Sequence, residues 1–308
     1  MRVAFMGSPE FAVPCLRAVA AAHEVALVVS QPDKPAGRGG ELRAPAVKVA
    51  AQELGLPIIQ PKSARNGELA QALRDARVEV AIVVAYGKIL PKDVLEAPPL
   101  GCINVHGSLL PKYRGAAPVQ WAVIDGEAET GVSIMQLDEG MDTGPVWAER
   151  RVAIGPEETA GELLARLAPI GAAALIEALP VIASGTARPV AQDHARATHA
   201  KMLDKTDGAI DWAQPARAIA ARIRGVDPWP GAYATLRGQP IKLFRAVVTD
   251  RTPAGDAGTV VAIDRDGVHV SCTGGVVAIR DVQAAGKKRM AAQAFASGRG
   301  IAVGDKLT

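Results

Sequence analysis

An almost unbroken apolar run at residues 78–85 constrains the fold of this chain more than any other feature. It reads V-E-V-A-I-V-V-A. It lacks the polar alternation of a strand with one face in water, so it predicts a strand buried on both faces. Such strands are typical of parallel sheets that helices cover on both sides. The run therefore predicts an α/β protein.

The N-terminus shows the βαβ pattern that such a sheet requires. Residues 2–6 and 25–29 predict two buried strands, and between them Ser8 fits an N-cap and Pro9 the first position of a helix. Residues 1–185 therefore predict a doubly wound, Rossmann-like domain. The first turn reads G-S-P rather than G-x-G-x-x-G, so we expect no NAD site.

The C-terminal part of the chain predicts a second, different domain. Residues 186–204 contain few large apolar side chains and predict a linker. In residues 205–308, short apolar runs alternate with turns at roughly ten-residue spacing, which predicts a small β-barrel (OB-like). This domain holds 15 Lys and Arg against 9 Asp and Glu, whereas the whole chain carries a net charge of only +3. A basic second domain indicates a polyanionic partner.

Composition argues against several classes of protein. Three widely spaced cysteines form no C-x-x-C pair, and the histidines show no metal-ligand spacing, so we expect neither a disulfide framework nor a metal. The apolar stretch 163–183 contains charged residues and two prolines, which predicts a helix broken at Pro169 and Pro180 and no membrane span. The N-terminus shows no signal-peptide pattern. We expect a cytoplasmic protein.

Residues 101–115 are the stretch most suited to chemistry. Asn104 and His106 alternate with apolar residues in a predicted strand, so both side chains lie on one face. Ligands of open α/β sheets bind at the carboxyl ends of the strands. An amide that donates hydrogen bonds and an imidazole that transfers a proton would lie side by side there. Taken alone, however, an N-x-H pair is more typical of two buried polar residues than of an active site.

Several segments together resemble the folate-dependent formyltransferases, and among them the methionyl-tRNA formyltransferases. They read G-S-P-E-F, Q-P-D-K-P-A-G-R-G, N-V-H-G-S-L-L-P-K-Y-R-G-A-A-P, G-M-D-T-G and P-W-P, and they extend over essentially the whole chain. The resemblance implies a transferase of protein biosynthesis. It would move the formyl group of 10-formyltetrahydrofolate to the α-amino group of methionyl-initiator tRNA for translation initiation.

The resemblance also implies three catalytic residues, Asn104, His106 and Asp142. Addition of a neutral amine to the formyl carbon creates an oxyanion and leaves a proton to be moved. Asn104 would donate hydrogen bonds to the oxyanion. His106 would serve the oxyanion or relay the proton, and Asp142 would orient and stabilise His106.

Binding residues follow from the same resemblance. The tetrahydrofolate-binding segment would be Ser108, Leu109, Leu110 and Pro111. The basic stretch 31–43 predicts a long loop without helix or strand that becomes ordered on tRNA. Its tRNA-binding residues would be Arg38, Lys34 and Arg43. Lys48, just beyond the loop, is a further candidate for a phosphate contact.

Other interpretations stay open at this point. A formyltransferase that acts on a sugar amine or a purine precursor would share the N-x-H pair and the Asp loop, but it would need neither a long basic loop nor a basic barrel. A tRNA-binding protein without catalysis would be expected to lack one of the three catalytic residues, and all three are present. We expect a monomer, since no heptad pattern is evident.

Overall fold

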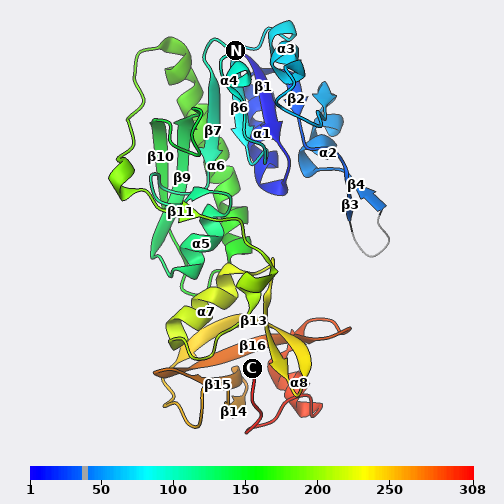
Figure 1. Ribbon diagram of the computed structural model, residues 1–308, viewed down its shortest axis with the longest axis vertical. Helices are drawn as coiled ribbons and strands as arrows, with labels where there is room; N and C mark the ends of the chain where they lie inside the picture. Colours follow the sequence, from blue (N-terminus) through cyan, green and yellow to red (C-terminus); the bar gives the residue numbers. More distant parts are fainter. Residues whose placement is uncertain (37–40) are drawn as a thin grey trace. The chain divides into compact units, whose positions relative to one another are not determined.

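The protein forms two compact units, each with its own sheet (Figure 1). The computed structural model describes residues 1–36 and 41–308. Unit 1 consists of Met1–Pro118, Thr130–Val152 and Leu164–Ala200, and unit 2 of Val119–Glu129, Ala153–Leu163 and Lys201–Thr308. The start of the last segment falls inside the predicted linker 186–204. The two early segments of unit 2 have no counterpart in the sequence prediction.

Unit 1 is built on a seven-stranded sheet in the order β10-β9-β7-β6-β1-β2-β5. The neighbours from β7 to β5 are parallel, and β9 runs antiparallel to β7. The strands are β1 (Arg2–Gly7), β2 (Glu24–Val29), β5 (Ile58–Ile59), β6 (Val80–Val84), β7 (Cys102–His106), β9 (Glu129–Gln136) and β10 (Val146–Ala153). Every residue of β6 is buried, as its apolar sequence predicts.

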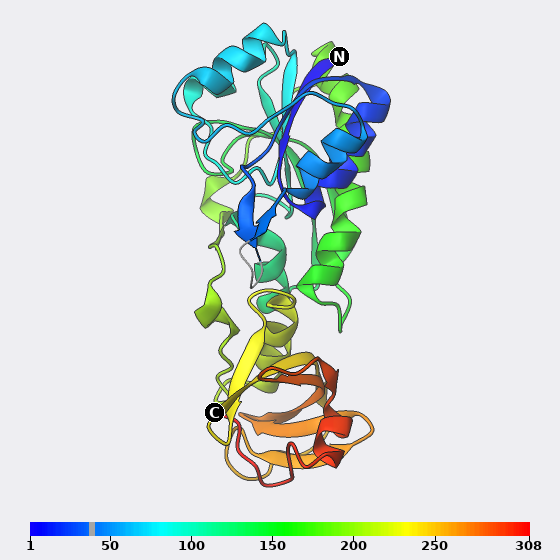
Figure 2. The ribbon, with the colours of Figure 1, turned by 90° about the vertical axis from the view of Figure 1, so that its right-hand side faces the viewer.

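Helices cover both faces of this sheet (Figure 2). On one face, Leu69 and Leu73 of α3 and Val94 of α4 share a core with even-numbered residues of β1 and odd-numbered residues of β6. On the other face, Gly171 of α6 lies so close to β7 that an added Cβ would be 2.9 Å from Val105. The helices and 3-10 turns up to residue 200 are η1 (Glu10–Ala12), α1 (Val13–Ala22), α2 (Ala46–Glu53), α3 (Glu68–Asp75), α4 (Lys92–Leu95), α5 (Pro118–Ile124), α6 (Ala160–Ser184) and η2 (His194–Arg196).

Helix α6 runs without interruption through Pro169 and Pro180, so the predicted breaks are wrong. Each proline removes one helical hydrogen bond, but Leu167, Leu175 and Leu179 are buried, and this packing outweighs the local preference. By length and composition alone α6 could cross a membrane. Half of its apolar window is buried inside the structure, as in the core helix of a globular protein.

The basic stretch 31–43 also differs from its prediction as an irregular loop. Strands β3 (Lys34–Ala36) and β4 (Glu41–Arg43) form an antiparallel hairpin in which Lys34 is paired with Arg43. Three-residue strands are too short to give a recognisable alternation in the sequence. Arg38 lies outside the described residues.

Unit 2 contains an antiparallel sheet in the order β12-β13-β16-β15-β14. The strands are β12 (Ala232–Leu236), β13 (Gln239–Thr249), β14 (Val260–Asp264), β15 (Gly267–Cys272), β16 (Gly275–Ala284) and β17 (Met290–Ala291), the last paired with β16. The helical elements are η3 (Lys205–Gly208), α7 (Ala216–Gly225) and α8 (Ala292–Ser297).

The end of the chain closes this sheet into a small barrel. Thr308 exchanges two backbone hydrogen bonds with Thr235 of β12, at 2.6 and 2.9 Å, and the Leu307 N–H donates to the carbonyl of Gly258, before β14, at 2.8 Å. Both edges of the sheet are therefore bridged by one segment. The predicted fold class, a Rossmann-like α/β domain and a small β-barrel, is confirmed.

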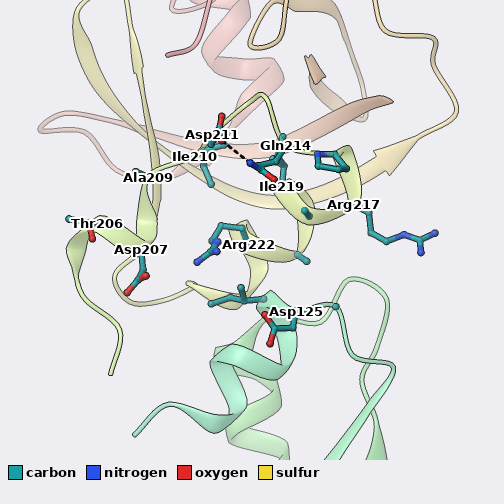
Figure 3. Close-up of a pocket in the computed structure, with 15 residues that line it drawn as sticks. Asp125, Thr206, Asp207, Ala209, Ile210, Asp211, Gln214, Arg217, Ile219 and Arg222 are labelled. Carbon is teal, nitrogen blue, oxygen red and sulfur yellow. Dashed lines mark hydrogen bonds between the residues drawn. The ribbon is translucent and has the colours of Figure 1, made fainter. Parts of the chain in front are cut away.

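A cavity of about 890 Å³ lies within unit 2 (Figure 3). It is lined by α7, by the chain before α7 and by residues 124–126, and Asp125, Asp207 and Arg222 are among its polar groups. The predicted catalytic residues all belong to unit 1. The chemistry therefore has to be sought in the first unit.

Closure by the C-terminal segment predicts a large stability cost for Leu307→Ala, because Leu307 is only 2% exposed. Deleting a buried leucine side chain lowers the free energy of unfolding by about 2–5 kcal/mol. Leu42→Ala is the matched control, since Leu42 is 70% exposed, and its effect should stay within about 0.5 kcal/mol. Denaturant unfolding measures both. Equal effects of the two substitutions would contradict the closure.

Candidate active site

Strand β7 places Asn104 and His106 on one face of the sheet, as the sequence predicts. It lies between β6, where Val83 is paired with Asn104, and β9, where Ser133 is paired with His106. Backbone pairing on both sides therefore fixes the strand. Val105, between the two polar residues, points to the opposite face, where it packs near α6.

The side-chain amide of Asn104 is a hydrogen-bonding group without a protein partner. Asn104 is 9% exposed. Within residues 1–36 and 41–308, no hydrogen bond joins its amide to another group. Leaving a buried polar group unpaired costs roughly 1–3 kcal/mol, so such groups are usually satisfied. An unpaired, nearly buried amide at the carboxyl end of a strand is suited to bind a ligand.

The ring of His106 is oriented by a backbone carbonyl. Its Nε2 lies 2.9 Å from the carbonyl oxygen of Tyr113. A carbonyl can only accept, so Nε2 carries the hydrogen and donates it. In the neutral ring the lone pair is then on Nδ1, which faces Oδ2 of Asp142 at 3.7 Å. This separation is longer than a hydrogen bond, so Nδ1 remains able to accept a proton.

Asp142 lies in the loop 138–144 between β9 and β10. Its Oδ2 accepts a hydrogen bond of 2.8 Å from the N–H of Gly115. The loop is closed from within by Asp138, whose Oδ1 accepts from the Gly140 N–H at 3.1 Å and from the Thr143 hydroxyl at 2.7 Å. The Asp142 carboxylate is therefore fixed by a backbone donor that is remote in sequence, which the sequence analysis did not predict.

The predicted folate segment forms a tight turn held by Ser133 of β9. The Ser133 hydroxyl donates to the carbonyl of Ser108 at 2.8 Å and accepts from the N–H of Leu110 at 3.1 Å. The Ser108 hydroxyl donates to the Lys112 carbonyl at 2.6 Å, so it is engaged within the turn. Ser108 and Leu110 are buried, whereas Leu109 and Pro111 are half-buried.

The residues predicted to contact tRNA differ in their surroundings. Lys34 and Arg43 are exposed and adjacent across the β3–β4 hairpin. Lys48 contacts both carboxylate oxygens of Asp33, at 2.7 and 2.9 Å. Gln60 donates to the same carboxylate, and the hydrogen bonds from Gln60 and Lys48 lower the pKa of Asp33. Lys48 thus holds the base of the hairpin and is not an unpaired cation.

Metal and thiol chemistry find little support among the described residues. No group of three His, Cys, Asp or Glu side chains there is arranged to hold a metal ion. Burial raises the pKa of the Cys15 and Cys102 thiols to about 12 and that of Cys272 to about 11. These thiols stay protonated at neutral pH and are poor nucleophiles.

Residues 186–200, interpreted from sequence as part of a linker, contribute to the site. Its strand β11 (His199–Ala200) pairs in parallel with β8 (Arg114–Gly115), and an added Cβ on Gly115 would lie 2.6 Å from the Ala200 carbonyl oxygen. Gln192 from the same segment contacts the Asp142 loop. The sequence of this segment has no helix or strand period that could have revealed these contacts.

Comparisons with known proteins match both parts of the chain. The family model "Formyl transferase" matches residues 1–179, and "Formyl transferase, C-terminal domain" matches residues 202–300. A methionyl-tRNA formyltransferase of Desulfotalea psychrophila is 48% identical over 98% of this chain and 94% of its own length. One of Sorangium cellulosum is 49% identical over 99% and 98%, respectively.

Solved structures of similar fold are more distant in sequence. An N-formyltransferase of Helicobacter canadensis, in complex with folinic acid and dTDP-3-aminofucose, has a TM-score of 0.68 at 16% identity and covers 94% of this chain and 99% of that chain. HypX of Aquifex aeolicus, in complex with tetrahydrofolic acid, has a TM-score of 0.65 at 18% identity. It covers 97% of this chain, which spans 47% of HypX. At these identities the likeness concerns the fold.

The two hydrogen bonds of Ser133 predict that Ser133→Ala destabilises the protein. The substitution leaves the Ser108 carbonyl and the Leu110 N–H without this partner, which costs about 1–3 kcal/mol of unfolding free energy. Ser63→Ala is the matched control, because the exposed Ser63 hydroxyl also accepts a backbone N–H. Urea unfolding distinguishes the two. A Ser133→Ala protein as stable as the control would show that the turn is held by other contacts.

Proposed function

This chain belongs to the formyl transferase family, among the methionyl-tRNA formyltransferases, and we propose that it formylates methionyl-initiator tRNA with 10-formyltetrahydrofolate. The observation that carries the proposal is the cluster of Asn104, His106 and Asp142 at the carboxyl end of β7. It combines an unpaired amide donor, a ring nitrogen able to accept a proton and a carboxylate. The product would be formylmethionyl-tRNA for translation initiation.

The reaction needs one bond formed, one bond broken and one proton moved. The neutral α-amino nitrogen of methionyl-tRNA attacks the formyl carbon, and the carbonyl electrons move onto oxygen. When this tetrahedral intermediate collapses, the bond between the formyl carbon and N10 of the folate breaks. The proton lost by the amine ends on N10, and the leaving group is tetrahydrofolate.

Asn104 would stabilise the oxyanion of this intermediate. Its side-chain N–H groups are not used by the described part of the protein, so they can bind the oxygen as charge develops on it. Because the amide is nearly buried, little water competes for it, which strengthens the interaction. The flanking β6 and β9 fix the strand that carries Asn104, so the donor needs little reorganisation.

His106 would carry the proton from the amine to the folate. Its Nε2 hydrogen is committed to the Tyr113 carbonyl, so Nδ1 is the nitrogen that accepts the proton and then gives it to N10. The protonated ring would be stabilised by the Asp142 carboxylate, 3.7 Å from Nδ1. In this proposal Asp142 acts on the charge of the ring, whereas the Tyr113 carbonyl sets its orientation.

Substrate binding is proposed on the residues that the resemblance assigns. The folate would bind at the turn of Ser108, Leu109, Leu110 and Pro111, with the half-buried Leu109 and Pro111 as its apolar surface. The tRNA would contact Lys34 and Arg43 on the hairpin, and Arg38, which comes between them in the sequence. We further propose a cytoplasmic monomer that uses folate as a co-substrate and needs neither NAD nor a metal.

Formylation of charged tRNA tests the proposal directly. The purified protein, 10-formyltetrahydrofolate and methionyl-initiator tRNA should give formylmethionyl-tRNA, and elongator methionyl-tRNA should give much less. Asn104→Ala should lower kcat by about 10²–10³-fold, the typical effect of losing one oxyanion donor. Gln71→Ala, an exposed substitution on α3, is the control. A protein that formylates an amino sugar nucleotide but not the initiator tRNA would refute the proposal.

Salt dependence tests the proposed tRNA contacts of the hairpin. Lys34→Ala and Arg43→Ala should each weaken tRNA binding and reduce the slope of log affinity against log salt by about one. Lys92→Ala removes an exposed lysine of α4 and should leave the slope unchanged. Filter binding over a salt series measures all three. Identical slopes in all variants would exclude Lys34 and Arg43 as phosphate contacts.

A further inference from the structure

The backbone of Asp142 adopts a left-handed conformation in a loop that packs tightly against β9. Its φ is +53°, a region that Asn and Asp adopt more readily than other L-residues. Gly144, two residues on, approaches β9 so closely that an added Cβ would lie 1.9 Å from the Gln136 carbonyl oxygen. The loop is therefore drawn tightly against β9, and the surrounding contacts hold it there.

Gln192 makes the contacts that hold this backbone. Its side-chain Nε2 donates to the carbonyl of Asp142 at 2.9 Å and to the carbonyl of Gly144 at 2.6 Å. Both donor hydrogens of the amide are thus used on the two residues that flank Thr143. Gln192 is 9% exposed, so water does not readily replace these bonds.

Arg114 in turn fixes Gln192. Its Nε and Nη2 donate to the Gln192 side-chain oxygen at 3.1 and 2.7 Å, and Nη2 lies 3.0 Å from Nδ1 of His194. Arg114 is 5% exposed, and no carboxylate pairs with it in the described part of the chain. A buried guanidinium whose acceptors are a neutral amide and an imidazole has unusual surroundings for a purely structural arginine. Because Nε and Nη2 both donate to the side-chain oxygen of Gln192, the amide nitrogen must point away from Arg114.

The two contacts converge on Asp142 from one short strand. Arg114 reaches the Asp142 backbone through Gln192, and the next residue, Gly115, donates its N–H directly to Asp142 Oδ2. Oδ2 is the oxygen that faces His106 Nδ1. The side chain of Asp142 is therefore bonded directly to β8, and its backbone carbonyl is connected to β8 through Gln192.

We propose that Arg114 and Gln192 are positioning residues that hold the Asp142 carboxylate against His106. The inference rests on the proposed formyl transfer and adds two residues to it that touch neither substrate. Without the two N–H donors of Gln192, the loop 138–144 is no longer held at the carbonyls of Asp142 and Gly144, and the carboxylate leaves its place beside Nδ1. The segment 186–200, which contains Gln192, is thus part of the active centre.

Gln192→Glu tests the contacts of Gln192 with the loop 138–144 separately from its contacts with Arg114. The glutamate still accepts from Arg114 but has no hydrogen to donate to the Asp142 and Gly144 carbonyls. We expect kcat to fall by about 10–100-fold, as for other misplacements of catalytic groups, while KM for both substrates stays within about twofold. Arg114→Lys keeps the charge but loses the fork, and should lower kcat in the same way. Gln71→Ala, which removes an exposed glutamine that also donates to a neighbour, should change neither constant.

The double variant provides a second measurement. Because Arg114 and Gln192 act through one set of contacts, Arg114→Lys combined with Gln192→Glu should be no slower than the slower single variant. Multiplicative losses would mean that the two residues act separately and would overturn the proposal. If Gln192→Glu does not fold, Arg114→Lys alone carries the kcat and KM comparison.

A spectroscopic measurement separates this inference from the proposed function. The ¹⁵N resonances of the His106 ring, assigned with His106→Gln, should shift in Gln192→Glu and remain unchanged in Gln71→Ala. Shifted resonances in a protein that does not formylate initiator tRNA would support the positioning of Asp142 and reject the proposed function. Unchanged resonances together with an unchanged kcat would overturn the positioning role, whatever the substrate is.

Discussion

The hydrogen bond from His106 Nε2 to the Tyr113 carbonyl is the interaction on which the rest of the site depends. It fixes the tautomer of the ring, and it directs the lone pair of Nδ1 towards Asp142. It also requires the chain to return to the end of β7 after only seven residues, which explains the tight turn and its support by Ser133. Strand β7, the turn that follows it and the loop that carries Asp142 together fix the orientation of the His106 ring.

The sequence predicted those parts of the site that lie in strands with a recognisable pattern of apolar residues. Alternation in β7 placed Asn104 and His106 on one face, and the apolar run of β6 predicted the parallel sheet. The catalytic role proposed for Asp142 came only from the family resemblance. Gln192 could not be predicted, because its contacts join residues 48 and 50 positions apart in a stretch without regular structure.

The sequence alone does not show which lysine and arginine side chains are free to bind a ligand. Lys48 and Lys34 belong to the same basic region, yet the first is paired with Asp33 and the second is exposed. The two prolines of α6 likewise show that local helix propensity does not decide the structure alone, because the packing of buried leucines maintains the helix through both prolines. Partners that are distant in sequence decide the outcome in each case.

Closure of the second unit by residues 305–308 also has a consequence for synthesis of the chain. The bridges from Thr308 to Thr235 and from Leu307 to Gly258 cannot form until these residues have left the ribosome. Unit 1 ends at Ala200 and can become compact earlier, during translation. The nascent barrel therefore remains open, with unpaired edge strands, until residues 305–308 have emerged, and during this interval it is most exposed to aggregation.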